Sequence, residues 1–179
     1  RVIFSVVKPG GVHRDITPDQ FDHIVHTLEG IKDEYAQIVK TFVNDSSVKN
    51  RLVGVGHISK EDAAKLSMVG PFLRASGVDY DVRNLRNGGY AYLDDFQPVT
   101  RTEGDCYARV LVRTQEVLQS IDIIEEMISK IPAGDIDVKV TGAPADGAEA
   151  CNVLEQPRGE CYYYAKGNGT KYLDRMRMR

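Results

Sequence analysis

The sequence lacks the features that define several classes of protein. Its three cysteines, Cys106, Cys151 and Cys161, form no C-x-x-C pair and leave an odd count, which argues against a disulfide framework and against a zinc or iron-sulfur site. No apolar stretch approaches the roughly 20 residues that a membrane span needs, and no charged-then-apolar leader opens the chain. A net charge of -3 offers no basic surface for nucleic acid. These absences favour a reducing compartment and a protein or small-molecule partner.

The composition is that of an ordinary globular protein. With 179 residues, 42% hydrophobic and 27% charged, the chain is long enough for one domain with a core, so we predict a single domain over residues 1–179. It starts at Arg1 and stops inside an alternating arginine and methionine run. We therefore expect an internal segment of a longer polypeptide, which in isolation exposes apolar patches and self-associates.

Three helices are predicted from their end signals. Thr17, Pro18 and Gln20 form a helix start, and the apolar period that follows continues to about residue 44, with Gly30 as a point where the helix kinks or divides. Ser59 caps a second helix, which runs through residue 68. The clearest helix covers residues 105–131, because one apolar stripe extends along it until Pro132.

The remaining segments predict loops and short strands. Residues 78–102 hold no period and indicate a long functional loop. Residues 136–140 alternate as a short strand, and residues 161–165 and 172–179 form a hairpin whose second strand separates a wet face from an apolar one. The predicted fold class is mainly α with a small β part (α+β), namely a helical bundle over 16–131 and a β appendage over 132–179.

Residues 70–83 carry the most informative pattern in the chain. Two glycines flank a short helical stretch, and Arg74, Asp81 and Arg83 lie within it or just after it. Such a set either tunes a carboxylate for proton relay or forms a buried ion-pair network that fixes the loop to the bundle. The two roles are compatible, so both stay open.

Five blocks follow one another along the chain. They are Pro9-Gly10-Gly11-Val12 with Asp15, Asn50-Arg51-Leu52-Val53-Gly54-Val55-Gly56, the run over residues 70–83, Gly104-Asp105-Cys106-Tyr107-Ala108-Arg109, and Glu155-Gln156-Pro157-Arg158-Gly159-Glu160. In this order they resemble the large subunit of nickel-iron hydrogenases and its relative, the 49 kDa quinone-side subunit of respiratory complex I. The resemblance covers nearly the whole chain and implies the helical-bundle core of the hydrogenase large subunit.

The resemblance also implies site residues. Arg158 matches the family arginine that hangs over the metals, where a fixed cation assists proton movement or holds diatomic ligands. The plainer alternative is an arginine that only pairs with Glu155 or Glu160. Asp81 and Arg83 are implied to orient the cavity or relay protons. His57, Glu160 and Arg74 are predicted to line the same cavity.

The family's nickel-iron centre needs four thiolates from two C-x-x-C pairs, and neither pair lies in this chain. Alone, the segment is therefore expected to bind no nickel and to show no hydrogenase activity. The short connection between Val140 and Glu155 and the stretch over residues 162–170 look most like the membrane-bound, energy-converting (Ech-type, group 4) hydrogenases, which couple hydrogen turnover to ion translocation.

Such a parent would lie in the cytoplasm, peripheral to the membrane. Its partners would be a small subunit with an iron-sulfur cluster and membrane-arm subunits. Two alternatives remain open: a quinone-reducing NADH or F420H2 dehydrogenase subunit without the cysteine pairs, and a non-catalytic assembly scaffold.

Overall fold

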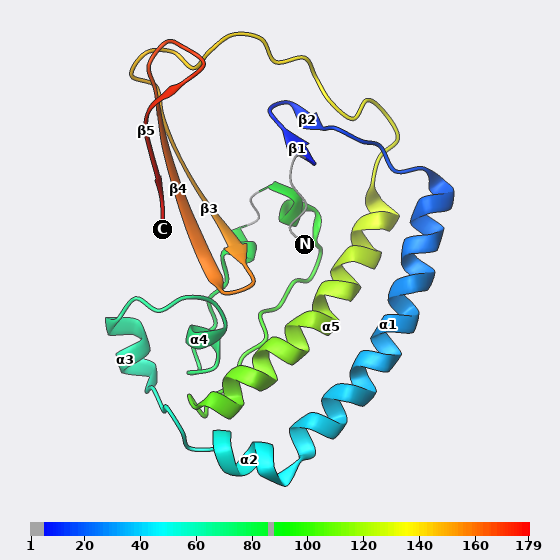
Figure 1. The fold of residues 1–179 in the computed structure, drawn as a ribbon, viewed down its shortest axis with the longest axis vertical. Coiled ribbons are helices and arrows are strands. Elements are labelled where there is room, and N and C mark those ends of the chain that lie inside the picture. Colours follow the sequence, from blue (N-terminus) through cyan, green and yellow to red (C-terminus); the bar gives the residue numbers. More distant parts are fainter. Residues whose placement is uncertain (1–5, 86–87) are drawn as a thin grey trace.

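Two long helices lie side by side along one flank of the molecule. In the computed structural model, which describes residues 6–85 and 88–179, α1 (Pro18–Asn44) and α5 (Cys106–Lys130) run antiparallel and pack against each other (Figure 1). The backbone amide of Thr17 donates to Gln20 Oε1 at 2.9 Å, as the predicted capping signal requires. α1 passes Gly30 unbroken, so a division there is not seen. Asp105 caps α5, and the helix stops just before Pro132, as predicted.

Three short helices lie between these two, where the sequence predicted one. α2 (Ser46–Leu52) begins almost at once after α1, because the Asp45 carboxylate accepts from the Val48 amide at 3.0 Å and caps a new helix. α3 (Lys60–Lys65) is capped by Ser59, but it ends before the predicted residue 68 because Ser67 takes a left-handed conformation with φ 50°. α4 (Gly70–Arg74) follows it directly.

The segment between α4 and α5 is mostly irregular, as predicted, with two 3-10 helices (Val82–Leu85 and Gly88–Tyr92) inside it. Residues 136–140 do not form the predicted strand. Asp137 makes one isolated bridge with Gly11, next to a small ribbon of β1 (Val7–Lys8) and β2 (Gly11–Val12), and Val138 and Val140 stay exposed. Because Val138 and Val140 are not buried against other elements, their alternation does not produce a strand of a sheet.

The C-terminal part is a three-stranded antiparallel sheet in the order β3, β4, β5, with β3 Glu149–Gln156, β4 Gly159–Gly167 and β5 Leu173–Met178. The predicted hairpin is confirmed as β4 and β5, but β3 was not anticipated. Gln156 pairs with Gly159, so Pro157 and Arg158 form a two-residue turn between β3 and β4. Every residue of β5 is exposed, so its alternation does not separate a wet face from an apolar one.

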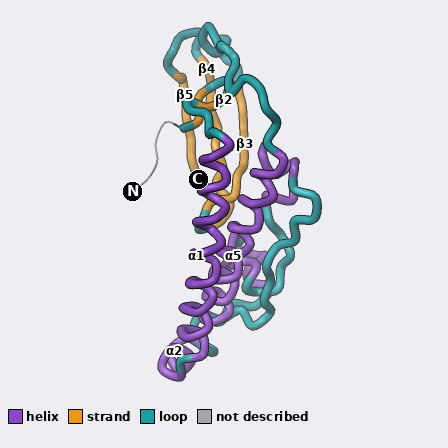
Figure 2. The backbone as a smooth tube through the Cα atoms, turned by 90° about the vertical axis from the view of Figure 1, so that its right-hand side faces the viewer, coloured by secondary structure: helices purple, strands orange, loops and turns teal. Residues whose placement is uncertain are grey.

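The protein is an α+β structure whose buried residues include charged side chains as well as apolar ones. One small cluster, Ala75, Ala108 and Val112 with Val99 against it, joins α4 to α5. Buried polar side chains surround this cluster, among them Arg74, Asp81 and Arg109. The sheet lies opposite the long helices, and the turn between β3 and β4 comes down onto α4 (Figures 1 and 2). No helix within residues 6–85 and 88–179 is long and apolar enough to cross a membrane.

Candidate functional site

A buried arginine at the end of α4 holds three carboxylates. The Arg74 guanidinium is 1% exposed, and its Nη1 lies 2.9 Å from Asp81 Oδ2. Its Nη2 lies 2.7 Å from Glu116 Oε1 and 2.9 Å from Glu155 Oε1. Nε also donates to Glu116 Oε1 at 2.8 Å. Charge-assisted bonds of this kind fix both distance and direction, so one side chain joins the irregular segment, α5 and β3 to α4.

Asp81 is completely buried and is shared by two guanidinium groups. Besides Arg74, it binds Arg83 through two parallel bonds, Nε to Oδ1 at 2.9 Å and Nη2 to Oδ2 at 2.6 Å. The Arg83 backbone amide also donates to Oδ1 at 2.9 Å, which sets the first turn of the 3-10 helix. The Arg83 guanidinium lies over the Phe96 ring at 4.5 Å. The predicted Arg74, Asp81 and Arg83 set is therefore one ion-pair cluster in the structure.

Burial and ion pairing have opposite effects on the pKa values of Glu155 and Arg83. Burial raises the pKa of the Glu155 carboxyl, and the nearby Arg74 guanidinium opposes that rise without cancelling it. For Arg83, burial disfavours the charge, yet the hydrogen bond and charge of Asp81 outweigh it and the pKa is raised. Arg83 thus stays a cation, whereas ionisation of Glu155 is disfavoured relative to an exposed glutamate.

The turn between β3 and β4 is seated on the start of α4 by two glycines. A Cβ atom built on Gly70 would lie 2.3 Å from Gly159 Cα and 2.9 Å from Arg158 O. A Cβ on Gly159 would lie 3.0 Å from Val69 Cγ2. Gly70 and Gly159 also have positive φ, at 66° and 133°. Two sequence motifs some 90 residues apart therefore meet backbone to backbone, and only glycine permits the contact.

Arg158 is exposed at this turn and makes no hydrogen bond or ion pair within the part of the chain that the structure describes. The carboxylates suggested as its plain partners are engaged elsewhere. Glu155 binds Arg74, and Glu160 accepts a hydrogen bond of 2.7 Å from the Tyr80 hydroxyl, which raises the pKa of Tyr80 to about 12, with burial adding to the effect. The turn thus presents a guanidinium whose backbone is fixed and whose donors are available.

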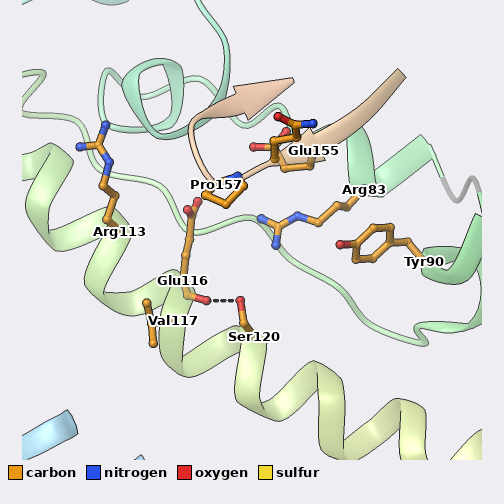
Figure 3. Close-up of a pocket in the computed structure, with 9 residues that line it drawn as sticks. Arg83, Tyr90, Arg113, Glu116, Val117, Ser120, Glu155 and Pro157 are labelled. Atoms are coloured by element: carbon orange, nitrogen blue, oxygen red, sulfur yellow. Dashed lines mark hydrogen bonds between the residues drawn. The ribbon is translucent and has the colours of Figure 1, made fainter. Parts of the chain in front are cut away.

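A cavity of about 420 Å³ lies between α5 and the β3–β4 turn. Figure 3 shows Arg83 and Tyr90 entering it from one side, Glu116 and Ser120 from α5, and Glu155 and Pro157 from the turn. Arg113 lines its edge, but its guanidinium points away from Glu116 in the same view and lies 5.3 Å from the Phe72 ring. The cavity therefore meets the ion-pair cluster at Arg83, Glu116 and Glu155.

His57 lies apart from this cluster. It is exposed beside Gly104, near the start of α5, and it does not line the cavity. The glycine turn before it is anchored by Asp105, whose Oδ2 accepts from the Gly54 amide at 2.7 Å, and by Arg109, which donates to Gly56 O at 2.6 Å. This block therefore secures the start of α5. Glu160 is set against Tyr80 instead of within the cluster.

Glu116 was missed by the sequence reasoning. It lies on the long helix, 42 residues from Arg74, and no local signal marks it apart from a carboxylate beside the apolar stripe. No group of three or more histidine, cysteine, aspartate or glutamate side chains in residues 6–85 and 88–179 is arranged to hold a metal ion. The described residues therefore do not fit a nickel-iron centre by themselves.

Comparisons with known proteins find the family that the five sequence blocks resemble. The family model described as "Respiratory-chain NADH dehydrogenase, 49 Kd subunit" matches residues 1–146. An NADH-quinone oxidoreductase subunit of Thermosipho melanesiensis is 32% identical over 176 residues, covering 94% of this chain and 47% of that protein. The carbon monoxide-induced hydrogenase of Rhodospirillum rubrum is 32% identical over 182 residues, covering 100% of this chain and 50% of that protein.

The fold likeness extends to a solved respiratory complex. A chain in the structure of the membrane-bound sulfane sulfur reductase, an archaeal respiratory membrane complex, superposes with a TM-score of 0.86 and 32% identity, covering 96% of this chain and 48% of that chain. This chain thus spans about half the length of the relatives that it matches.

Proposed function

The chain belongs to the family of the 49 kDa subunit of respiratory-chain NADH dehydrogenase, and from this premise we propose that it forms the central part of the catalytic large subunit of a membrane-associated, energy-converting nickel-iron hydrogenase. The likeness to the carbon monoxide-induced hydrogenase supports this proposal. The partners would be a small iron-sulfur subunit and membrane-arm subunits, with the complex peripheral to the cytoplasmic membrane.

One observation carries the catalytic role. The contact of Gly70 with Gly159 and the cluster around Arg74 hold the β3–β4 turn from two sides, yet Arg158 at the turn has no partner among the described residues. A planar guanidinium on a fixed backbone is a two-pronged donor that keeps its charge throughout a reaction. Its role is to orient an anionic or reacting group supplied from outside this segment, and Arg74, Asp81 and Arg83 act as positioning residues.

Within residues 6–85 and 88–179, no histidine, cysteine, aspartate and glutamate side chains are grouped so as to hold a metal ion. What the chain contributes is the placement of Arg158 and a cavity at the same turn whose lining includes charged residues. The thiolate ligands of the proposed parent would come from two C-x-x-C pairs in other parts of that subunit.

The substitution Arg158→Lys in the intact complex tests the proposal. Lysine keeps the charge but cannot donate from two fixed directions, so we expect hydrogen turnover to fall by about 10²-fold or more, as for other lost transition-state donors. Since Arg158 has no bond within the described chain, the free energy of unfolding should change by less than about 0.5 kcal/mol.

The exposed Arg177 on β5 of the same sheet offers the matched control Arg177→Lys, which should leave turnover unchanged. Unchanged turnover in Arg158→Lys as well would refute the assigned role. It would favour the third reading of the sequence, a scaffold domain without catalytic residues.

A quinone-reducing subunit is the second candidate, because the Thermosipho melanesiensis NADH-quinone oxidoreductase protein is as similar in identity as the hydrogenase. The same turn and cavity would then serve an electron acceptor of the quinone class. The two candidates differ in the flanking sequence of the source gene. Two C-x-x-C pairs there would support the hydrogenase, and their absence would support the quinone-reducing protein.

A further inference from the structure

The buried cluster contains more carboxylates than cations. Arg74 and Arg83 face Asp81, Glu116 and Glu155, which leaves one negative charge in excess if all five groups are ionised. Asp81 takes the stronger share, because both guanidinium groups bind it and its side chain is fully buried. The excess charge therefore falls on the other two carboxylates.

Glu116 and Glu155 converge on one nitrogen atom. Their Oε1 atoms lie 2.7 Å and 2.9 Å from Arg74 Nη2, and their side chains are only 15% and 7% exposed. Two carboxylates in such a position repel each other in a medium that screens poorly. A shared guanidinium offsets only part of this repulsion.

Among the described residues, no cation other than Arg74 forms an ion pair with Glu116 or Glu155. Arg113, on the same helix as Glu116, donates to the Arg109 carbonyl and lies over Phe72. Three hydroxyl groups lie nearby and carry no positive charge: that of Tyr80, which donates to Glu160, and those of Tyr90 and Ser120, which line the cavity. The cluster therefore carries an uncompensated negative charge at the wall of the cavity, which a proton can neutralise.

We propose that Glu116 and Glu155 hold one proton between them and form a proton-exchange site in the wall of the cavity. A hydronium ion entering the cavity transfers its proton to a carboxylate oxygen, which forms a carboxylic acid and leaves a water molecule. The reverse step returns the proton, and no electron moves. Protonation brings the net charge of the cluster from negative to neutral. The upward shift of the Glu155 pKa by burial agrees with Glu155 as the main carrier.

The proton-exchange site lies next to the turn that carries Arg158. Glu155 is at the end of β3, three residues before Arg158, and Pro157 of the same turn lines the cavity with it. A proton held there is next to the turn that presents the guanidinium. This link to the reaction rests on the proposed function, whereas the shared proton itself depends only on the cluster.

Infrared difference spectroscopy of the intact complex tests the shared proton without using turnover. We expect the wild type to show, at neutral pH, the carbonyl band of one protonated carboxylic acid that shifts in D2O. The band should disappear in Glu155→Gln, and in Glu116→Gln it should move or disappear. It should remain in the control Glu149→Gln, since Glu149 is an exposed residue of the same strand.

A wild-type spectrum without any protonated carboxyl band at neutral pH would overturn the proposal, and this measurement needs no variant to fold. A band that is identical in the wild type, Glu155→Gln and Glu116→Gln would overturn it equally. Failure of the proposed function is seen separately, since it appears in the turnover of Arg158→Lys and leaves this spectrum unaffected.

Discussion

The glycine contact beneath the β3–β4 turn predicts a large effect for Gly70→Ala. Gly70 has φ 66°, and an L-residue in that left-handed conformation costs about 1–2 kcal/mol. The added Cβ would also lie 2.3 Å from Gly159 Cα, a backbone atom that cannot rotate away. Forcing an extra methyl group into a packed contact costs about 1–3 kcal/mol more. The expected loss in stability is thus about 2–5 kcal/mol.

Gly54→Ala is the matched control for this prediction. Gly54 has a similar φ of 71°, but a Cβ on it meets nothing within 4 Å. Its loss should be the conformational part alone, about 1–2 kcal/mol. The difference between the two variants isolates the seating of the turn on α4, about 1–3 kcal/mol.

Hydrogen exchange of the intact protein, followed by mass spectrometry, measures this difference where it arises. Amides of β3 and β4 should exchange about 5- to 150-fold faster in Gly70→Ala than in Gly54→Ala, because each 1.4 kcal/mol is a tenfold change in an equilibrium constant. Turnover of the complex should fall in Gly70→Ala, since the turn that carries Arg158 is displaced. Equal exchange in the two variants would show that the glycines do not hold the turn.

Three further predictions concern charged and titrating groups. Arg74→Met should destabilise the protein by about 3–5 kcal/mol in chemical denaturation, because it leaves buried carboxylates unpaired. The control Lys32→Met, at an exposed ion pair, should cost less than about 1 kcal/mol, and equal losses in the two variants would contradict the cluster. In a spectrophotometric titration one tyrosine should ionise near pH 12 and be missing from Tyr80→Phe, since the hydrogen bond to Glu160 favours the neutral phenol. Because the pKa of Glu155 is raised in the folded state, its protonation contributes stability that is fully present below the ordinary glutamate pKa and is lost as pH rises through the raised value. Glu155→Gln should remove this pH dependence of the free energy of unfolding. The same dependence in the variant would refute the prediction.

The sequence predicted those parts of the fold that local signals determine. Thr17 and Asp105 cap the two long helices, Pro132 follows the second, and the turn near residue 168 joins β4 to β5, all within a few residues of the prediction. Each of these depends on hydrogen bonds or dihedral angles within one turn of chain. Such interactions are visible in the order of the residues.

The sequence could not predict features that depend on distant contacts. β3 is largely exposed and shows no clear alternation, so its formation depends on pairing with β4. The ion pair of Glu116 with Arg74 depends on the packing of α5 against α4. Arg158 was placed before a hairpin, whereas the extra strand puts it at the centre of a turn. In each case the missing information was the relative position of two segments.

The balance of packing in the middle of the molecule indicates why the charged cluster is present. The buried apolar cluster consists of two alanines and one valine with Val99 against it, whose contacts have little directional preference. Burying five ionisable groups costs several kcal/mol per ion before their attraction is counted, and an apolar set of similar volume is often as stable or more so. Overall stability therefore does not explain the cluster. Bonds of fixed direction from Arg74 to three other segments do explain it, because they define where the β3–β4 turn lies and thus where Arg158 is presented. The same bonds leave one carboxylate without a cation of its own, so the cluster that positions the turn also creates the site that takes up a proton.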